Sequence, residues 1–139
     1  MEVAFFDTSA LVKHYHIERG TREVDELMSK HIVAISELAI VEVTSALNRK
    51  YLGGEIIRSK LEWVLERFYA DLENYVVVRI DSGTISLASS LVLKHGLKTL
   101  DALQLASALS IKGDLGIFVT SDSKLKEAAE RENLNVVLI

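Results

Sequence analysis

The sequence predicts an α/β domain in which helices cover both faces of a parallel sheet. Five short runs of apolar, mostly β-branched residues have the length and continuity of strands that are buried on both faces. Helical patterns fill the intervals between these runs, and strands that alternate with helices form parallel sheets. The chain has 139 residues, which is the size of one domain, so we expect a single domain over residues 1–139.

The five expected strands are short, apolar segments spread over the whole chain. They are expected at Val3–Phe6, Ile32–Ile35, Tyr75–Ile80, Ile117–Thr120 and Val136–Ile139. Because parallel strands end at the same edge of a sheet, polar residues that follow these segments are expected to lie at one edge, where open α/β sheets carry their chemistry.

The expected helices are recognised by capping residues and by apolar residues at helical spacing. Ser36 is expected to cap a helix that runs to about Leu52 and stops at Gly53-Gly54. This helix and the next one fall between the second and third strands, so residues 36–72 are expected to form a helical hairpin. The other helices are expected at Thr21–Lys30, Glu55–Leu72, Ser82–His95, Thr99–Lys112 and Ser123–Glu132.

The composition excludes several classes of protein. The chain has no cysteine, which excludes disulfide scaffolds, thiolate zinc sites, iron–sulfur clusters and cysteine nucleophiles. No uncharged run reaches the ~18–20 residues that a membrane span needs. The N-terminal segment is acidic at Glu2 and has only a short apolar run, unlike a signal peptide. We therefore expect a soluble, cytoplasmic protein with no membrane partner.

Two acidic residues follow expected strands directly. Asp7 comes after the first strand, and Asp122 comes after the fourth strand and Ser121. Each also precedes an expected helix, so capping of that helix explains either residue when it is taken alone.

Two further acids lie in expected helices. Glu42 is in the middle of its helix, and its helical neighbours are small, apolar or uncharged, so its charge has no cationic partner nearby. Glu37, in contrast, falls in the first turn, where an exposed acid complements the helix dipole. Asp101 falls in the first turn of a helix that is otherwise uncharged and largely apolar, which indicates more than a surface role.

The four acids Asp7, Glu42, Asp101 and Asp122 are expected to converge at the carboxyl edge of the sheet. Two carboxylates in close contact repel each other by up to ~4 kcal/mol at an effective dielectric of 20. Protons or cations must offset this repulsion. Oxygen ligands without cysteine or histidine select hard cations, so the pattern favours a Mg²⁺ or Mn²⁺ site.

The net charge agrees with a local acidic cluster. The chain carries 16 Lys and Arg residues and 20 Asp and Glu residues, for a formal net charge of −4. The four candidate acids equal this excess, so the remaining chain is balanced. A nucleic-acid substrate is then compatible with the net charge, and the candidates for phosphate contacts near the acidic segments are Lys13, Lys98, Lys124 and Lys126.

The order and spacing of the acidic segments add a resemblance to a known family. The segments that carry it are Asp7–Leu11, Ser36–Leu47, Leu100–Ala106, Phe118–Asp122 and the tail Leu125–Val137. Together they resemble the PIN-domain ribonucleases, of the small single-domain kind found in VapC toxins. The resemblance spans the chain from Val3 to Ile139.

The resemblance implies a fold, an activity and a set of site residues. The fold would be a three-layer α/β/α sandwich with a central parallel sheet of four to five strands. The activity would be Mg²⁺- or Mn²⁺-dependent hydrolysis of single-stranded RNA, with Asp7, Glu42, Asp101 and Asp122 as the acidic positions. Ser9 and Thr120 match the family's hydroxyls and would orient carboxylates or waters. The resemblance also implies a homodimer that is inhibited by a cognate antitoxin.

Other functions remain open at this level. One is a PIN fold retained for protein interaction without turnover. Another is a Mg²⁺-dependent phosphatase with Asp7 as nucleophile, although positions 9 and 11 are Ser9 and Leu11 instead of the acid and threonine typical of such enzymes. A metal-free ribonuclease that works by two histidines would leave Glu42 unexplained. His14 and His16 resemble a metal-binding pair, but no third ligand lies near them in the sequence.

Overall fold

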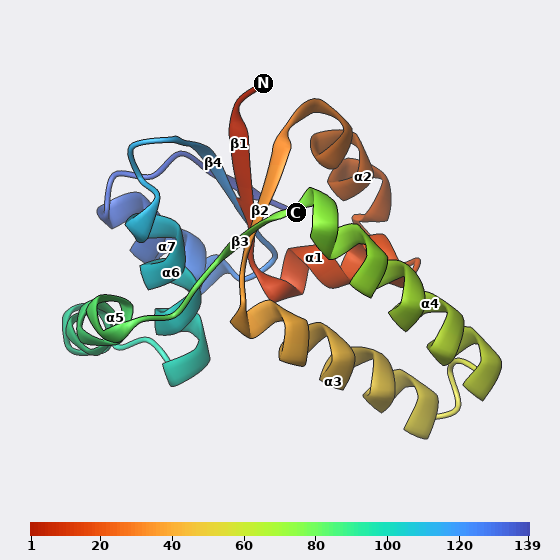
Figure 1. Cartoon of the computed structure of the whole chain (residues 1–139). Coiled ribbons are helices and arrows are strands. Elements are labelled where there is room, and N and C mark those ends of the chain that lie inside the picture. The colour runs from red at the N-terminus through yellow and green to blue at the C-terminus, as the bar shows by residue number, and fades with distance from the viewer.

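The sheet of the computed structural model, which describes all of residues 1–139, has five parallel strands in the order β3-β2-β1-β4-β5 (Figure 1). The strand β1 is therefore central, and β2 and β4 are its neighbours. The bounds are Val3–Phe6 for β1, Ile32–Ser36 for β2, Val76–Val78 for β3, Leu115–Thr120 for β4 and Val136–Leu138 for β5. All five expected strands are confirmed, although β3 is shorter than Tyr75–Ile80.

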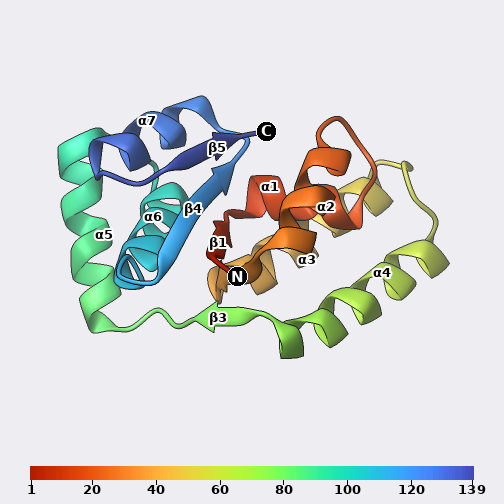
Figure 2. The same cartoon turned by 90° about the horizontal axis from the view of Figure 1, so that it is seen from above.

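Helices pack on both faces of the sheet, so the predicted three-layer sandwich is confirmed (Figure 2). The helices α1 to α4 share one hydrophobic core, and α5 to α7 share the other. Successive side chains of β1 point to opposite faces of the sheet, so this strand contributes to both cores. Ala4 and Phe6 belong to the first core and Phe5 to the second. The helices span Thr8–Tyr15, Thr21–Lys30, Leu38–Leu52, Arg58–Asp71, Ser82–His95, Thr99–Ser110 and Ser123–Arg131.

The helices α3 and α4 form the predicted hairpin, which runs out from the sheet and back (Figure 1). The second arm begins later than expected, at Arg58 instead of Glu55. Gly54 has a φ of 80°, a conformation that glycine adopts without strain, and the turn it opens keeps Ile57 71% exposed. The Ser36 hydroxyl oxygen accepts a hydrogen bond of 3.2 Å from the backbone N–H of Leu38, but Glu37 occupies the N-cap position of α3.

Two phenols, one buried and one half-buried, tie the C-terminal end of α4 to the core. The Tyr15 hydroxyl donates to Asp71 Oδ2 at 2.7 Å and lies 2.6 Å from the Tyr75 hydroxyl. Burial raises the pKa of both phenols, to about 12 for Tyr75, so both stay neutral. This network joins α1, α4 and the segment before β3.

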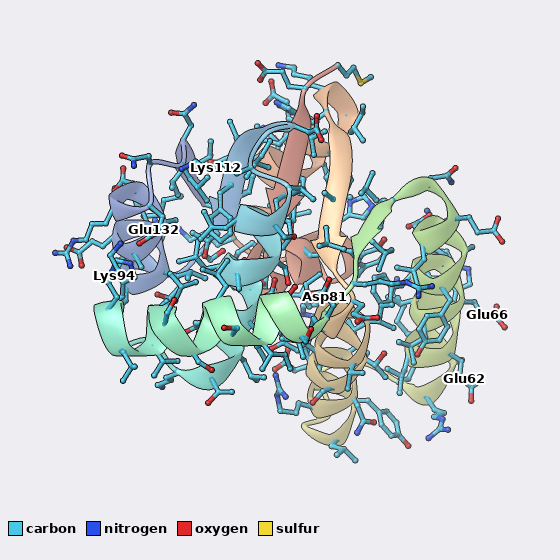
Figure 3. All side chains as sticks on the ribbon, turned by 60° about the vertical axis from the view of Figure 1, so that its left-hand side comes forward. Glu62, Glu66, Asp81, Lys94, Lys112 and Glu132 are labelled. Atoms are coloured by element: carbon cyan, nitrogen blue, oxygen red, sulfur yellow. The ribbon has the colours of Figure 1, made fainter.

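On the other face of the sheet, contacts around Glu132 hold together the helices that cover it (Figure 3). Glu132 Oε2 lies 2.6 Å from His95 Nε2 and 2.8 Å from Lys94 Nζ, and its backbone carbonyl accepts a hydrogen bond of 2.8 Å from Lys112. These contacts join the ends of α5, α6 and α7. Two helices end earlier than expected there: α6 ends at Ser110, before a turn, and α7 ends at Arg131.

None of the helices combines the length and the hydrophobicity that crossing a bilayer requires.

Candidate active site

Asp7 lies at the carboxyl end of the central strand and is almost completely buried, with 3% of its surface exposed. It is also the N-cap of α1, because its Oδ1 accepts the backbone N–H of Ala10 at 3.0 Å. The same Oδ1 accepts the Ser9 hydroxyl at 2.7 Å, and Oδ2 accepts the Thr120 hydroxyl at 2.6 Å. The capping and site interpretations of Asp7 are therefore compatible.

The charge of Asp7 is unfavourable in this position. Burial raises the pKa of Asp7 to about 6, although the hydrogen bonds from Thr120, Ser9 and Ala10 oppose the rise. The nearby charge of Asp101 raises it further. A buried carboxylate with several hydrogen-bond donors and a raised pKa is typical of a functional site.

Asp122 lies at the carboxyl end of β4 and is joined to Asp7 by Thr120. The Thr120 hydroxyl donates to Asp7 and accepts the backbone N–H of Asp122 at 3.0 Å. Asp122 is also the N-cap of α7, because its Oδ1 accepts the backbone N–H of Leu125 at 2.9 Å. Ser9 adds a second link between the same two segments, because its hydroxyl oxygen accepts a hydrogen bond of 3.0 Å from the backbone N–H of Ser121.

Glu42 is held by residues from two other helices. Its Oε1 accepts the Thr8 hydroxyl at 2.7 Å and the Gln104 side-chain amide at 2.8 Å. The amide of Gln104 also lies 3.0 Å from the Thr8 hydroxyl. The prediction that mid-helix Glu42 needs a partner is therefore confirmed, but the partners are neutral donors instead of a cation.

Asp101 is the electrostatic centre of the cluster. Its pKa is raised, first by burial and then by the charges of Asp122 and Glu42, whereas Lys98 and Lys124 lower it. Because Asp101 also raises the pKa of Asp7, it interacts with all three other acids. The structure thus brings the four predicted acids, from four different segments, into one electrostatic cluster.

The donor set fits a hard divalent cation, but the side chains do not enclose one as they stand. No three carboxylate or histidine groups lie close enough together to hold a metal ion. The four carboxylates are the oxygen ligands that Mg²⁺ and Mn²⁺ prefer, and their mutual repulsion is what a cation would offset. Holding an ion therefore requires side-chain movement within the cluster.

Glu37 has a different role from the one expected. Its Oε1 accepts the backbone N–H of Ile80 at 2.6 Å, and its own backbone N–H donates to the Val78 carbonyl at 2.9 Å. The interpretation of Glu37 as an exposed acid that only complements a helix dipole is therefore wrong. It fastens the start of α3 to the end of β3.

A shallow hollow of about 340 Å³ lies beside Glu42. Glu42 is the only acid in its lining, Thr8 supplies a hydroxyl, Arg49 supplies a cation, and the apolar part includes Leu100, which is 47% exposed. Lys98 and Lys124 are the lysines that act on Asp101, whereas Lys13 and Lys126 pair with Glu18 and Glu130. Of the four predicted lysines, two therefore lie near the acidic cluster.

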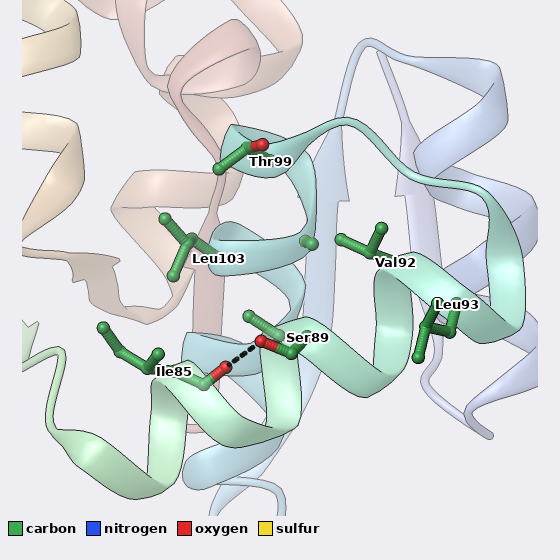
Figure 4. A pocket seen from close by; sticks show the side chains of 8 residues that line it. Ile85, Ser89, Val92, Leu93, Thr99 and Leu103 are labelled. Atoms are coloured by element: carbon green, nitrogen blue, oxygen red, sulfur yellow. Dashed lines mark hydrogen bonds between the residues drawn. The ribbon is translucent and has the colours of Figure 1, made fainter.

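The most apolar hollow is elsewhere, between α5 and α6 (Figure 4). It is lined by aliphatic side chains such as Ile85, Val92 and Leu93, with only the hydroxyls of Ser89 and Thr99 as polar groups. It contains no charged or titratable side chain and so has no catalytic chemistry of its own.

Thr8 and Gln104 were missed by the sequence reasoning. Gln104 is an amide in the apolar helix α6 and is only 3% exposed. The argument that identified Glu42, a polar group among apolar neighbours, applies equally to it. The histidines assemble no metal site, because His14 pairs with Asp25 at 2.6 Å and His16 lies 3.5 Å from Glu55.

Comparisons with known proteins agree with the fold. The PIN domain family profile matches residues 4–131. Ribonuclease VapC46 of Mycobacterium tuberculosis is 33% identical over 138 residues, which cover 99% of this chain and 98% of that protein.

Solved structures share the fold at lower sequence identity. PAE2754 from Pyrobaculum aerophilum matches with a TM-score of 0.70 and 21% identity, over 97% of this chain and 83% of that chain. VapC20 of Mycobacterium tuberculosis, described as a sarcin-ricin loop cleaving toxin, matches with a TM-score of 0.69 and 16% identity, over 90% and 94%. A toxin–antitoxin complex from Klebsiella pneumoniae includes a chain with a TM-score of 0.66 and 21% identity, over 87% and 88%. On the profile match and the whole-length identity to a VapC ribonuclease, the chain belongs to the PIN-domain family.

Proposed function

We propose that the chain is an endoribonuclease that requires Mg²⁺ or Mn²⁺ and hydrolyses phosphodiester bonds of single-stranded RNA. The observation that carries the proposal is the electrostatic cluster around Asp101: the charges of Asp122 and Glu42 raise the pKa of Asp101, and the charge of Asp101 in turn raises the pKa of Asp7. Bringing four carboxylates together at one edge of the sheet lowers the stability of the fold. A bound cation would offset their repulsion, which explains why the chain keeps them there.

The four acids are assigned to cation binding, and a bound divalent cation would supply a more acidic water and stabilise negative charge on the phosphate. The protein's part is to place the carboxylates. Asp7 is the most restrained of them, because three donors fix its two oxygens. In hydrolysis, one of the four acids would take the proton of the water whose oxygen bonds to phosphorus, while the bond between phosphorus and the leaving ribose oxygen breaks and that oxygen takes a proton from solvent.

The RNA is proposed to lie across the hollow beside Glu42. Arg49 in this hollow and Lys98 and Lys124 near Asp101 offer cations to backbone phosphates. The apolar lining, which includes Leu38, Val41 and Leu100, is suited to an unpaired base. Unpaired bases expose their faces and edges, so this lining favours single-stranded RNA over a duplex.

The biological role we propose is that of the toxin in a toxin–antitoxin pair, active in the cytoplasm as a homodimer and inhibited by a cognate antitoxin. The support is the identity to Ribonuclease VapC46 and the similarity of fold to chains from a Klebsiella pneumoniae toxin–antitoxin complex and from DNA-bound VapBC of Salmonella typhimurium. A coding sequence for a small DNA-binding protein beside this one would support the pair, and the mass in solution tests the dimer.

The decisive experiment is RNA cleavage by purified protein with Mg²⁺ or Mn²⁺, compared with Asp7→Asn and Asp122→Asn. Each variant is expected to lose more than about 100-fold in rate, and EDTA is expected to abolish cleavage. Full activity of both variants, or full activity in EDTA, contradicts the proposal. A linear phosphate end indicates attack by water, whereas a cyclic phosphate would favour a metal-free mechanism.

Two alternatives have less support. A phosphatase with Asp7 as nucleophile would carry a second acid and a threonine two and four residues after it, and this chain has Ser9 and Leu11 there. A protein-interaction module without turnover has no use for a costly acidic cluster. Metal-dependent cleavage that is lost on Asp122→Asn separates an enzyme from such a module.

A further inference from the structure

Gln104 is a buried amide whose neighbours on α6 are almost all apolar. It lies one turn after Asp101, and only 3% of it is exposed. An amide in such a position is costly unless its polar atoms are paired. Its Nε2 is paired twice, with Glu42 Oε1 at 2.8 Å and with the Thr8 hydroxyl at 3.0 Å. Its Oε1 is buried and has no partner.

The orientation of the amide follows from its neighbours. A carboxylate accepts hydrogen bonds and donates none, so the group facing Glu42 Oε1 must be the NH₂ end of Gln104. Thr8 has one hydroxyl proton, which it gives to Glu42 at 2.7 Å, and it therefore accepts from Gln104. The three side chains form a closed set in which every donor has an acceptor.

This set engages one oxygen of Glu42 and leaves the other free. Oε1 accepts two hydrogen bonds, from Thr8 and Gln104, whereas Oε2 accepts none from the protein. Glu42 and Thr8 line the hollow of about 340 Å³, and Gln104 does not. The amide thus holds the carboxylate from the interior side, and the carboxylate is reached by solvent from the hollow.

Burying Gln104 does not improve the core. An acceptor left without a donor loses the hydrogen bonds it makes to water in the unfolded chain, so an apolar side chain of the same shape would suit the core at least as well. What Gln104 contributes, and an apolar residue cannot, is the pair of N–H groups given to Glu42 and Thr8. That exchange of stability for a fixed carboxylate is typical of functional sites.

We propose that Gln104, together with Thr8, is a positioning residue that fixes the Glu42 carboxylate with Oε1 engaged and Oε2 free to bind the divalent cation. The inference rests on the proposed function, because Glu42 is a cation ligand only there. Hydrogen bonds that orient a metal-binding carboxylate set its affinity, and their loss commonly weakens metal binding or activity by about 10–100-fold.

The test compares Gln104→Met with the wild-type chain by titration with Mn²⁺, followed by electron paramagnetic resonance or calorimetry. Methionine keeps the length of the side chain and removes both donors and the unpaired acceptor. The expected result is a Kd for Mn²⁺ that rises about 10-fold or more, with a thermal midpoint equal to or above that of the wild type. Cleavage lost at low Mn²⁺ should return at high Mn²⁺, with kcat largely retained.

A second variant keeps the test independent of how Gln104→Met folds. Thr8→Val removes the hydroxyl that donates to Glu42 and should weaken Mn²⁺ binding in the same direction, whereas Thr8→Ser should restore it. Because both residues act on one oxygen, the double variant should lose less than the sum of the single losses. Ser110→Ala, at the exposed end of the same helix, is the control and should bind Mn²⁺ as the wild type does.

Each outcome decides one question. A wild type that binds Mn²⁺ and variants that bind it equally well overturn the positioning role and leave the proposed function standing. A Gln104→Met chain whose thermal midpoint falls in parallel with its Mn²⁺ affinity, with no recovery at high Mn²⁺, shows a structural role and also overturns it. A wild type that neither binds Mn²⁺ nor cleaves RNA overturns both.

Discussion

Thr120 Oγ1 donates a hydrogen bond of 2.6 Å to Asp7 Oδ2 across 113 residues of sequence. The same hydroxyl accepts the backbone N–H of Asp122 at 3.0 Å, so one threonine joins the first and the last acid of the cluster. The bond is possible because β1 and β4 are paired in parallel and end together, with Phe6 opposite Val119. The carboxyl ends of two strands therefore define the site before any helix contributes to it.

Removing this hydroxyl by Thr120→Val should destabilise the fold and weaken the site together. The backbone N–H of Asp122 and one oxygen of Asp7 both lose a partner, which costs about 1–3 kcal/mol of unfolding free energy for each buried group left unpaired. Thr120 also lowers the pKa of Asp7, so the variant should raise that pKa further. Urea unfolding measures the first effect. Thr120→Ser keeps the hydroxyl and should stay close to the wild type; equal losses in both variants would contradict this account.

Asp7→Asn should make the metal-free protein more stable near neutral pH while abolishing cleavage. Burial raises the pKa of Asp7 to about 6, so at higher pH the folded chain contains a buried charge that the unfolded chain keeps in water. A rise of about two pKa units corresponds to ~3 kcal/mol, from which rearranged hydrogen bonds subtract part. We expect a gain of about 1–3 kcal/mol for the variant in EDTA, measured by urea unfolding. A variant less stable than the wild type at pH above about 6 would contradict the burial cost.

The pH dependence of that gain has a definite sign. The folded-state pKa of Asp7 lies above its usual value of 3.8, so the folded chain binds this proton more tightly than the unfolded chain does. The contribution of Asp7 to stability is complete below about pH 4 and is lost as the pH rises to about 6. The difference in unfolding free energy between Asp7→Asn and the wild type should therefore grow over this interval and then level off. A difference that is constant from about pH 4 to about pH 7 would show that Asp7 titrates normally.

Much of this arrangement follows from the sequence alone. A strand that is buried on both faces appears in the sequence as a continuous run of apolar residues. For this reason the bounds of the first strand, Val3–Phe6, are predicted correctly. Asp7 and Asp122 come directly after such runs, and parallel pairing brings them to one edge. The ends of helices are less certain: Glu55, Ile56 and Ile57 fit a helical pattern, but the turn after Gly54 takes them out of α4.

The tertiary partners of the acids could not be predicted in the same way. Glu42 meets Gln104 across 62 residues and Thr8 across 34, and no local pattern records such pairs. Glu37 shows the reverse problem, because its position in the first turn suggests a surface role and only the fold reveals its bond to Ile80. Sequence identifies which groups are costly to bury, and the fold determines which partners offset that cost.

Glu37 and Glu42 offer a matched pair of substitutions on one helix. Glu42→Gln should reduce metal-dependent RNA cleavage by more than about 100-fold, because it removes a charge from the cluster around Asp101. Glu37→Gln should leave cleavage within about two-fold, because an amide oxygen can still accept the N–H of Ile80. Initial rates on unstructured RNA give the comparison. Equal losses in the two variants would indicate a general effect on α3 instead of a specific role for Glu42.

The last prediction concerns the lysines beside the cluster. Lys98 and Lys124 both lower the pKa of Asp101, so their charges lie close to the proposed cation site. If they contact RNA phosphates, Lys98→Ala and Lys124→Ala should each weaken binding at low salt and reduce the slope of log K against log salt by about 0.7, the value for one contact to a single strand. Fluorescence anisotropy with labelled RNA over a range of KCl concentrations measures this slope. Lys30→Ala is the control, because Lys30 is occupied by Glu26 at 2.8 Å on the exposed face of α2. A slope that is unchanged in both site variants would remove these lysines from the RNA path and leave Arg49 as the cation nearest the hollow.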